Sequence, residues 1–220
     1  MHVRVNAAMS VDGKLSTRER TQVEISGPED FERVDALRAE HDAVMVGIGT
    51  ILADDPSLTV KDTGRRAERQ ERGEPPNPAR VVVDSSLRTS VDARVMDDAA
   101  TTYLLASESA APAAVGEMEA AGATVLQHGD DRVDLTASLN ALQDQGIDRL
   151  LVEGGGEVVF SLFAGNLVDR LSVFIGSKII GGRTAPTLAD GDGFREDDIR
   201  SLELESVERL DDGLVLTYVC

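Results

Sequence analysis

The sequence is poor in cysteine, lysine and long hydrophobic runs, and each shortage excludes a class of protein. Its single cysteine is Cys220, which excludes a framework of disulfide bonds. No apolar run approaches the roughly 18 residues that a transmembrane helix needs, and residues 1–10 lack the basic segment and apolar core of a signal peptide. We therefore expect a cytoplasmic protein with no membrane partner.

Lysine occurs only at positions 14, 61 and 178, while 40 Asp and Glu residues face 22 Lys and Arg residues, giving a net charge of −18. The negative electrostatic potential of such a chain repels nucleic acid, so we expect no nucleic-acid partner. An acid-rich, lysine-poor composition is typical of proteins from a high-salt cytoplasm, where the Debye length falls to about 3 Å at 1 M salt. We predict a halophilic archaeal source, with an ordinary acidic protein as the alternative.

The length and the pattern of apolar residues predict one α/β domain over residues 1–220. Short β-rich runs alternate with helical patterns, and the helical signal fades after about Asp169, which favours antiparallel strands at the C-terminal edge of the sheet. Strands are expected at 3–8, 43–47, 80–84, 102–106, 123–126, 149–153, 171–176 and 214–219.

Two further local predictions concern a helix and a loop. Ser26 and Glu29 form a capping-box pattern, and Phe31, Val34 and Arg38 then follow at helical spacing, which places Arg38 beside the buried face. Residues 62–79 are rich in charge and carry three prolines, so we expect an exposed loop or excursion there.

Several well-known motifs are absent. Residues 47–52 resemble a dinucleotide turn but carry leucine in place of the third glycine. Residues 190–194 start like a calcium loop but have phenylalanine where the third ligand belongs, and the three histidines lack zinc-site spacing, so no metal site is expected. Serine-hydrolase and zinc-deaminase signatures are also missing.

What remains is a set of polar segments that each follow a predicted strand, where open α/β sheets bind ligands. The most specific one is a buried strand ending in Glu153, followed by three glycines and a helix start. Backbone N–H groups at such a turn can form an anion site suited to a diphosphate, although tight packing of the turn would also require glycine. The other segments are 6–14, 46–59 and 81–86, and each taken alone could be a plain turn or cap.

These segments together resemble the riboflavin-pathway reductases, a family that includes 2,5-diamino-6-ribosylamino-4(3H)-pyrimidinone 5′-phosphate reductase and the C-terminal reductase domain of the bifunctional bacterial riboflavin enzyme. The resemblance covers nearly the whole chain and rests on residues 6–14, 37–38, 42–50, 54–59, 80–85, 152–156 and 178–182.

The resemblance implies a dihydrofolate-reductase-like fold, with a mostly parallel central sheet flanked by helices and antiparallel C-terminal edge strands. It also implies a homodimer that uses NADPH, or alternatively NADH, to reduce the ribosyl group of a phosphorylated pyrimidine to a ribityl group by hydride transfer to C1′. A start at Met1 leaves no room for a fused deaminase, so we expect a separate one in the same pathway.

The resemblance also assigns site residues position by position. Glu153 and Asp12 are the candidate proton donors, and Arg38 is expected to orient the 5′-phosphate, which it can hold bidentately. The cofactor-binding positions are Thr50, Asp54, Ser85, Gly154, Gly155, Gly156, Glu157 and Val158. The substrate-binding positions are Asn6, Arg38, Leu58, Lys61 and Glu153, with Lys61 standing where many bacterial members have arginine.

Two other functions stay open at this point. One is a dihydrofolate or pteridine reductase, which would share the fold and cofactor but reduce a ring C=N bond of a substrate without phosphate. The other is a non-catalytic nucleotide-binding protein, which would bind the cofactor without turnover. For the cofactor itself, Arg88 is a possible partner of the 2′-phosphate that distinguishes NADPH from NADH.

Overall fold

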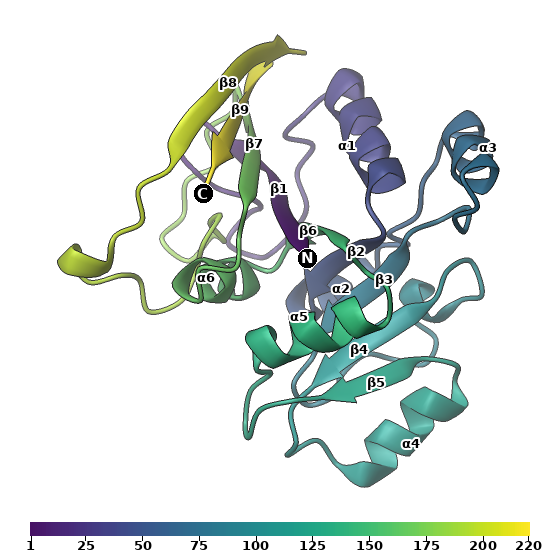
Figure 1. Cartoon of the computed structure of the whole chain (residues 1–220). Coiled ribbons are helices and arrows are strands. Elements are labelled where there is room, and N and C mark those ends of the chain that lie inside the picture. Colours follow the sequence, from purple (N-terminus) through teal and green to yellow (C-terminus); the bar gives the residue numbers. More distant parts are fainter. The chain divides into compact units, whose positions relative to one another are not determined.

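Nine strands and six α-helices make up the chain in a computed structural model that describes all residues 1–220 (Figure 1). Contacts between Cα atoms divide the chain into two units. The continuous unit comprises Asp35–Leu151 with Met1, and the split unit comprises His2–Val34 and Val152–Cys220. Both α1 (Pro28–Glu40) and β6 (Arg149–Gly154) contribute residues to each unit. None of the helices combines the length and hydropathy needed to span a membrane.

The continuous unit is built on parallel strands in the order β5-β4-β3-β2. All five residues of β2 are buried, as expected for a parallel strand covered on both faces. The helix α2 packs on β2, and α4 and α5 pack against β5. The bounds are β2 Ala43–Gly47, α2 Ile48–Asp54, α3 Thr63–Glu71, β3 Ala79–Val83, η1 Arg94–Met96, β4 Thr102–Ala106, α4 Pro112–Ala120, β5 Thr124–Gln127 and α5 Leu135–Asp144.

The split unit carries strands in the order β1-β7-β9-β8, with β1 and β7 parallel and the two later pairs antiparallel. The predicted α/β class, mostly parallel with antiparallel C-terminal edge strands, is therefore confirmed. We did not predict β8, because its exposed, acid-rich sequence lacks the apolar alternation of a half-buried strand. The bounds are β1 His2–Ser10, α6 Gly156–Ala164, β7 Arg170–Gly176, η2 Glu196–Asp198, β8 Glu203–Leu210 and β9 Gly213–Val219.

The capping box predicted at the start of α1 is wrong. The N-cap residue is Gly27, whose carbonyl oxygen accepts from the Phe31 N–H group at 3.1 Å and which has no side chain to cap with. Asp211, in the turn between β8 and β9, supplies the cap: its carboxylate accepts from the N–H groups of Gly27, Glu29 and Asp30 at 3.0–3.2 Å. Glu29 reciprocates by accepting from the Asp211 N–H group at 3.0 Å. Glu29 and Asp211, which cap each other in this way, are 182 residues apart in sequence.

The buried face of α1 also differs from the prediction. Phe31 is 56% exposed, whereas Asp30 and Leu37, seven residues apart, are both buried. A helix turns by about 100° per residue, so the face is rotated by one position from the one that Phe31 marked. The prediction assumed that the buried face carries apolar residues. Asp30 is buried instead, because it forms an ion pair with Arg33 at 2.8 Å.

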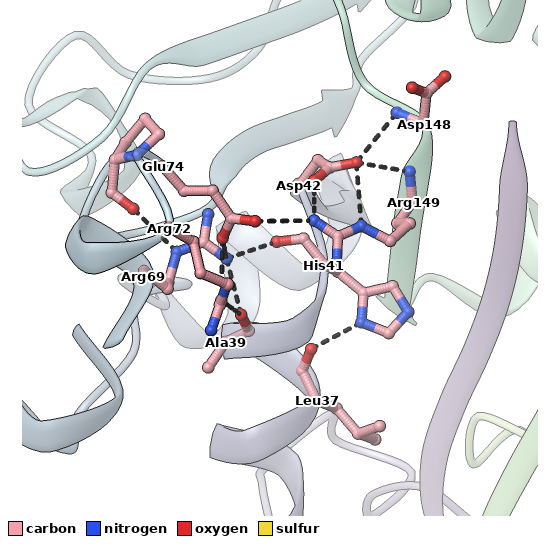
Figure 2. Close-up of polar contacts among 10 residues, drawn as sticks. Leu37, Ala39, His41, Asp42, Arg69, Arg72, Glu74, Asp148 and Arg149 are labelled. Atoms are coloured by element: carbon pink, nitrogen blue, oxygen red, sulfur yellow. Dashed lines mark hydrogen bonds and ion pairs between the residues drawn. The ribbon is translucent and has the colours of Figure 1, made fainter. Parts of the chain in front are cut away.

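The predicted loop at 62–79 instead contains α3, which begins after Asp62, whose carboxylate accepts from the Arg65 N–H group. Its residue Arg69 is 1% exposed and donates to the carbonyl oxygens of Ala39, His41 and Pro75 at 2.8–2.9 Å. Figure 2 shows the Arg69 guanidinium close to Ala39 and His41, at the C-terminal end of α1. Arg69 therefore satisfies carbonyl groups that a helix end leaves without partners.

A second arginine extends this network to the start of β6. Arg149 forms ion pairs with Asp42 at 2.5 Å and with Glu74 at 3.1 Å (Figure 2). Glu74 also pairs with Arg72 at 2.9 Å and Arg69 at 3.5 Å. Some charges of the 62–79 segment thus make internal contacts of the continuous unit, while most of its residues are exposed as expected.

Candidate functional site

In the continuous unit, the segment that follows α2 has an unusual backbone. Asp55 and Leu58 both have a positive φ, 39° and 52°, and Leu58 is only 2% exposed. A left-handed conformation is costly for a leucine and persists where the surroundings impose it, often at binding sites. Asp55 is held by Arg94, whose N–H group donates to its carboxylate at 2.8 Å. The turn therefore has a fixed shape, with the predicted substrate residue Leu58 at its centre.

Hydroxyl groups and cations gather directly after this turn. The Lys61 Nζ atom lies 2.6 Å from Ser57 Oγ and 2.9 Å from Thr59 Oγ1, and Arg38 Nη1 donates to the Thr59 carbonyl oxygen at 3.1 Å. Partial burial lowers the pKa of Lys61, and the neighbouring charges of Arg38 and Arg94 lower it further. Two crowded cations flanked by hydroxyl donors form a site suited to a phosphate group.

Asp35 holds this cluster in place from α1. Its carboxylate accepts from the backbone N–H groups of Lys61 at 2.5 Å and Asp62 at 3.1 Å. It also forms an ion pair with the Arg65 guanidinium at 3.2 Å. Neither Asp35 nor the hydroxyls of Ser57 and Thr59 were among the residues predicted from the sequence. A signal existed for Asp35, because it precedes Arg38 by three residues and so lies next to it on the helix.

The predicted cofactor residues of the continuous unit lie on two elements. Thr50 and Asp54 are four residues apart on α2 and so share one helix face. Desolvation raises the pKa of Asp54 above its ordinary value. Ser85 follows β3, and its hydroxyl accepts from the Val133 N–H group at 3.2 Å, so part of its hydrogen-bonding capacity serves the loop structure.

In the split unit, Asn6 lies in β1 and is 6% exposed. Its carboxamide oxygen accepts from Arg33 Nη2 at 2.9 Å. The orientation of this predicted substrate residue is therefore set from α1, by an arginine that the sequence alone did not single out.

Asp12 is engaged in holding a loop. Its carboxylate accepts from the Ser10 hydroxyl at 2.6 Å and from the N–H groups of Ile180 and Gly181 at 3.1 and 2.7 Å. These hydrogen bonds, that from Ser10 first, lower the pKa of Asp12 to about 2. A carboxylate with this pKa is ionised at neutral pH, which makes Asp12 a poor proton donor; its contacts tie the 10–14 turn to the 178–182 segment.

The glycine turn joins β6 to α6. Glu153 is half-buried next to the fully buried Leu150, Leu151 and Val152. Gly155 has φ 94°, a left-handed backbone that favours glycine, and no side chain caps the N-terminus of α6. A Cβ atom at position 156 would lie 2.6 Å from the Asp190 carboxylate, so packing alone requires that glycine. The uncapped N–H groups can bind an anion such as a cofactor diphosphate.

Comparisons with known proteins extend over nearly the whole chain. Residues 1–216 match the family model described as the RibD C-terminal domain. The chain is 46% identical over 216 residues to a 2,5-diamino-6-ribosylamino-4(3H)-pyrimidinone 5′-phosphate reductase from Archaeoglobus fulgidus, covering 98% of this chain and 96% of that protein. It is also 46% identical over 219 residues to a reductase of the same name from Methanothermobacter thermautotrophicus, covering 99% and 97%.

A solved structure gives the same picture for the fold. A pyrimidine reductase-like protein from Corynebacterium diphtheriae aligns with a TM-score of 0.86, covering 99% of this chain and 91% of that chain. At 20% identity this similarity shows the fold alone.

Proposed function

The chain belongs to the RibD C-terminal domain family, and from this membership we propose that it is an oxidoreductase of riboflavin biosynthesis. The proposed reaction reduces the ribosyl group of 2,5-diamino-6-ribosylamino-4(3H)-pyrimidinone 5′-phosphate to a ribityl group. The resemblance to the riboflavin-pathway reductases and the dihydrofolate-reductase-like fold are confirmed by the same relatives.

One observation carries the choice of a phosphorylated substrate. Lys61 Nζ contacts the hydroxyls of Ser57 and Thr59, and Arg38 donates to the Thr59 carbonyl oxygen, in a chain whose net charge is −18. In a chain whose acids outnumber its basic residues by 40 to 22, a crowded basic cluster with its hydroxyl donors fixed in place favours a dianion. In our proposal Arg38 and Lys61 hold the 5′-phosphate and thereby orient C1′ of the substrate.

A nicotinamide cofactor follows from the reductase assignment, and we propose NADPH, with NADH as the alternative. When bound, it supplies the reducing equivalent. The proposed cofactor-binding residues are Thr50 and Asp54 on α2, Ser85 after β3, and Gly154, Gly155, Gly156, Glu157 and Val158 at the glycine turn. The uncapped α6 N-terminus fits this role because its N–H groups remain available for a diphosphate.

For the proton that completes the reduction we propose Glu153. Asp12, the other candidate, has a pKa of about 2 and three hydrogen bonds that stabilise its charged form. Glu153 lies at the carboxyl end of β6, directly before the glycine turn that we propose as the cofactor diphosphate site. This position supports Glu153 as the general acid, because open α/β sheets bind ligands at the carboxyl ends of their strands.

We further propose a homodimer, in which β8 and β9 of two copies meet. Leu204 and Val207 on β8 are 52% and 55% exposed, and Leu214 on β9 is 42% exposed. The pairings Leu204↔Tyr218, Val207↔Leu216 and Arg209↔Leu214 place these side chains on one face, because a register shift between Leu204 and Ser206 absorbs the odd spacing. An exposed apolar face on an edge strand is typical of an association surface. The cytoplasmic location stays a prediction.

The test is NADPH oxidation at high and low salt with the ribosylamino-pyrimidinone phosphate, its dephosphorylated form, its deaminated counterpart, and dihydrofolate as separate substrates. We expect turnover of a phosphorylated ribosylamine and a large rise in KM once the phosphate is removed. The deaminated counterpart shows whether reduction precedes or follows deamination, and a parallel series with NADH tests the cofactor.

The other outcomes separate the alternatives. Turnover of dihydrofolate alone would assign a dihydrofolate or pteridine reductase. Binding of NADPH without turnover of any substrate would favour the non-catalytic nucleotide-binding protein. Arg88→Ala tests the cofactor preference: a weaker NADPH affinity with unchanged NADH affinity is expected if Arg88 contacts the 2′-phosphate.

A further inference from the structure

Arg33 on α1 connects a buried acid to the proposed substrate residue Asn6. Its Nε and Nη2 atoms both lie 2.8 Å from Asp30 Oδ1, and Nη2 also lies 2.9 Å from Asn6 Oδ1. The side chains of Asp30 and Arg33 are 2% and 18% exposed, and Asn6 is 6% exposed. All three belong to the split unit, so the chain of contacts Asp30, Arg33, Asn6 is complete within it.

This contact fixes which end of the Asn6 carboxamide faces inward. A guanidinium group only donates hydrogen bonds, so the atom facing Arg33 must be the carboxamide oxygen. The nitrogen of Asn6, which carries two N–H donors, is then the atom that remains for a ligand. Without Arg33, the carboxamide could rotate and present either end.

Asp30 is in turn held by the β8–β9 turn. Its N–H group donates to Asp211 at 3.0 Å, and the Asp211 carboxylate also accepts from the N–H groups of Gly27 and Glu29. A Cβ atom at position 27 would lie 2.6 Å from Asp211 Cγ, so this contact leaves no room for a side chain there. The first turn of α1, which carries Asp30, is therefore held in place by Asp211. This fixes the position of the carboxylate that anchors Arg33.

We infer that Arg33 is a positioning residue: anchored by Asp30, it orients Asn6 so that Asn6 presents an N–H donor, and the substrate group that Asn6 recognises is a hydrogen-bond acceptor. This inference rests on the proposed function, in which Asn6 contacts the substrate. Arg33 itself does not need to touch the substrate, since its effect is transmitted through the carboxamide.

A double-mutant cycle tests it on the full-length protein, with the ribosylamino-pyrimidinone phosphate and NADPH. Arg33→Met is expected to raise the substrate KM about tenfold, the loss of roughly one oriented hydrogen bond, with little change in the KM for NADPH. Asn6→Ala is expected to raise it similarly. The double variant should match Asn6→Ala alone, because Arg33 acts only through Asn6.

Arg33→Lys is the conservative variant and should restore most of the substrate affinity, since lysine also only donates. The matched control is Arg18→Met, which removes an exposed arginine paired with Glu19 in the same unit. If Arg33→Met does not fold, Asp30→Asn replaces it in the cycle, with a smaller rise in KM expected from the weakened anchor.

The outcomes are distinct. Additive effects of Arg33→Met and Asn6→Ala, or an unchanged substrate KM in folded Arg33→Met, would overturn the inference while leaving the reductase function intact. A wild-type protein that turns over no ribosylamino phosphate with either nicotinamide cofactor would instead overturn the proposed function.

Discussion

Arg38 is the residue whose shape, as well as charge, the proposed reaction uses. A planar guanidinium can hold a phosphate through two parallel hydrogen bonds, whereas a lysine ammonium acts as a point charge. We expect Arg38→Lys to raise the substrate KM about tenfold, equal to about 1.4 kcal/mol, with a smaller effect on kcat. Steady-state kinetics with the phosphorylated substrate measures this, and unchanged kinetics would remove Arg38 from the phosphate site.

Asp12 is a second residue whose role can be tested, through the pH dependence of stability. Its pKa is about 2 in the folded chain, below its ordinary value of 3.8, so its ionised form stabilises the fold. This contribution is complete above about pH 4 and is lost as the pH falls toward 2. We expect Asp12→Asn to lower the urea midpoint at neutral pH, and the difference from wild type to shrink below about pH 4.

The control for Asp12 is Asp131→Asn, which removes an exposed acid of the continuous unit. It should leave the urea midpoint close to that of the wild type across this pH range. Equal midpoints for Asp12→Asn and wild type at neutral pH would show that the hydrogen bonds to Ile180 and Gly181 contribute little.

Among the elements, α3 depends on one buried side chain. Arg69→Met would remove a buried donor to three carbonyl oxygens and one of the three arginines that pair with Glu74, so we expect it to lower the free energy of unfolding by about 3 kcal/mol. Urea denaturation measures the change. The exposed neighbour Gln70, replaced by Ala, should change stability by less than about 0.5 kcal/mol. A loss of similar size in both variants would mean that Arg69 has no special role.

The elements also show where sequence reasoning succeeds and fails. Strands such as β2 and β6 were predictable because a short, continuous run of apolar residues is typical of a buried parallel strand. The start of α1 was not, since its cap is Asp211, and no local pattern reveals a partner 182 residues away. The same limit applies to α3, where the burial of Arg69 depends on carbonyl groups at and just after the end of α1, about 30 residues earlier, and on that of Pro75.

The site was predictable to a similar extent. The glycine turn and the segment around Leu58 were found because short motifs carry them, and the resemblance to a family assigned their roles. Arg33 and Asp35 were missed because each acts on a residue from a distant part of the chain: Asn6 for the first and Lys61 for the second. A charged residue on a helix gives no sign in the sequence of which group it will contact.

At the scale of the whole molecule, the proposed homodimer gives a direct prediction. Val207→Glu or Leu214→Glu would place a charge on the exposed apolar face of β8 and β9 and should shift the protein from dimer to monomer. Light scattering coupled to size-exclusion chromatography measures this. Val91→Glu, at an exposed apolar position of the continuous unit, is the control and should stay dimeric. A monomeric wild type would refute the proposal.

The net charge of −18 leads to a second prediction at this scale. Repulsion among the acids opposes folding, and salt screens it over a Debye length of about 3 Å at 1 M. We expect the free energy of unfolding to rise as KCl increases from about 0.1 M to about 2 M. Maximal stability at low salt would argue against a halophilic source.

The division of the chain into a continuous and a split unit has a consequence for synthesis. Asp35–Leu151 emerges from the ribosome as one stretch and can begin to fold while later residues are still being made. His2–Val34 emerges before this stretch but must wait for Val152–Cys220 before its unit can form, and α1 lacks its N-terminal cap until Asp211 is translated. His2–Val34 thus matures later than the stretch that follows it, and a nascent chain stalled before the β8–β9 turn would expose β1 and an uncapped helix to chaperones and proteases.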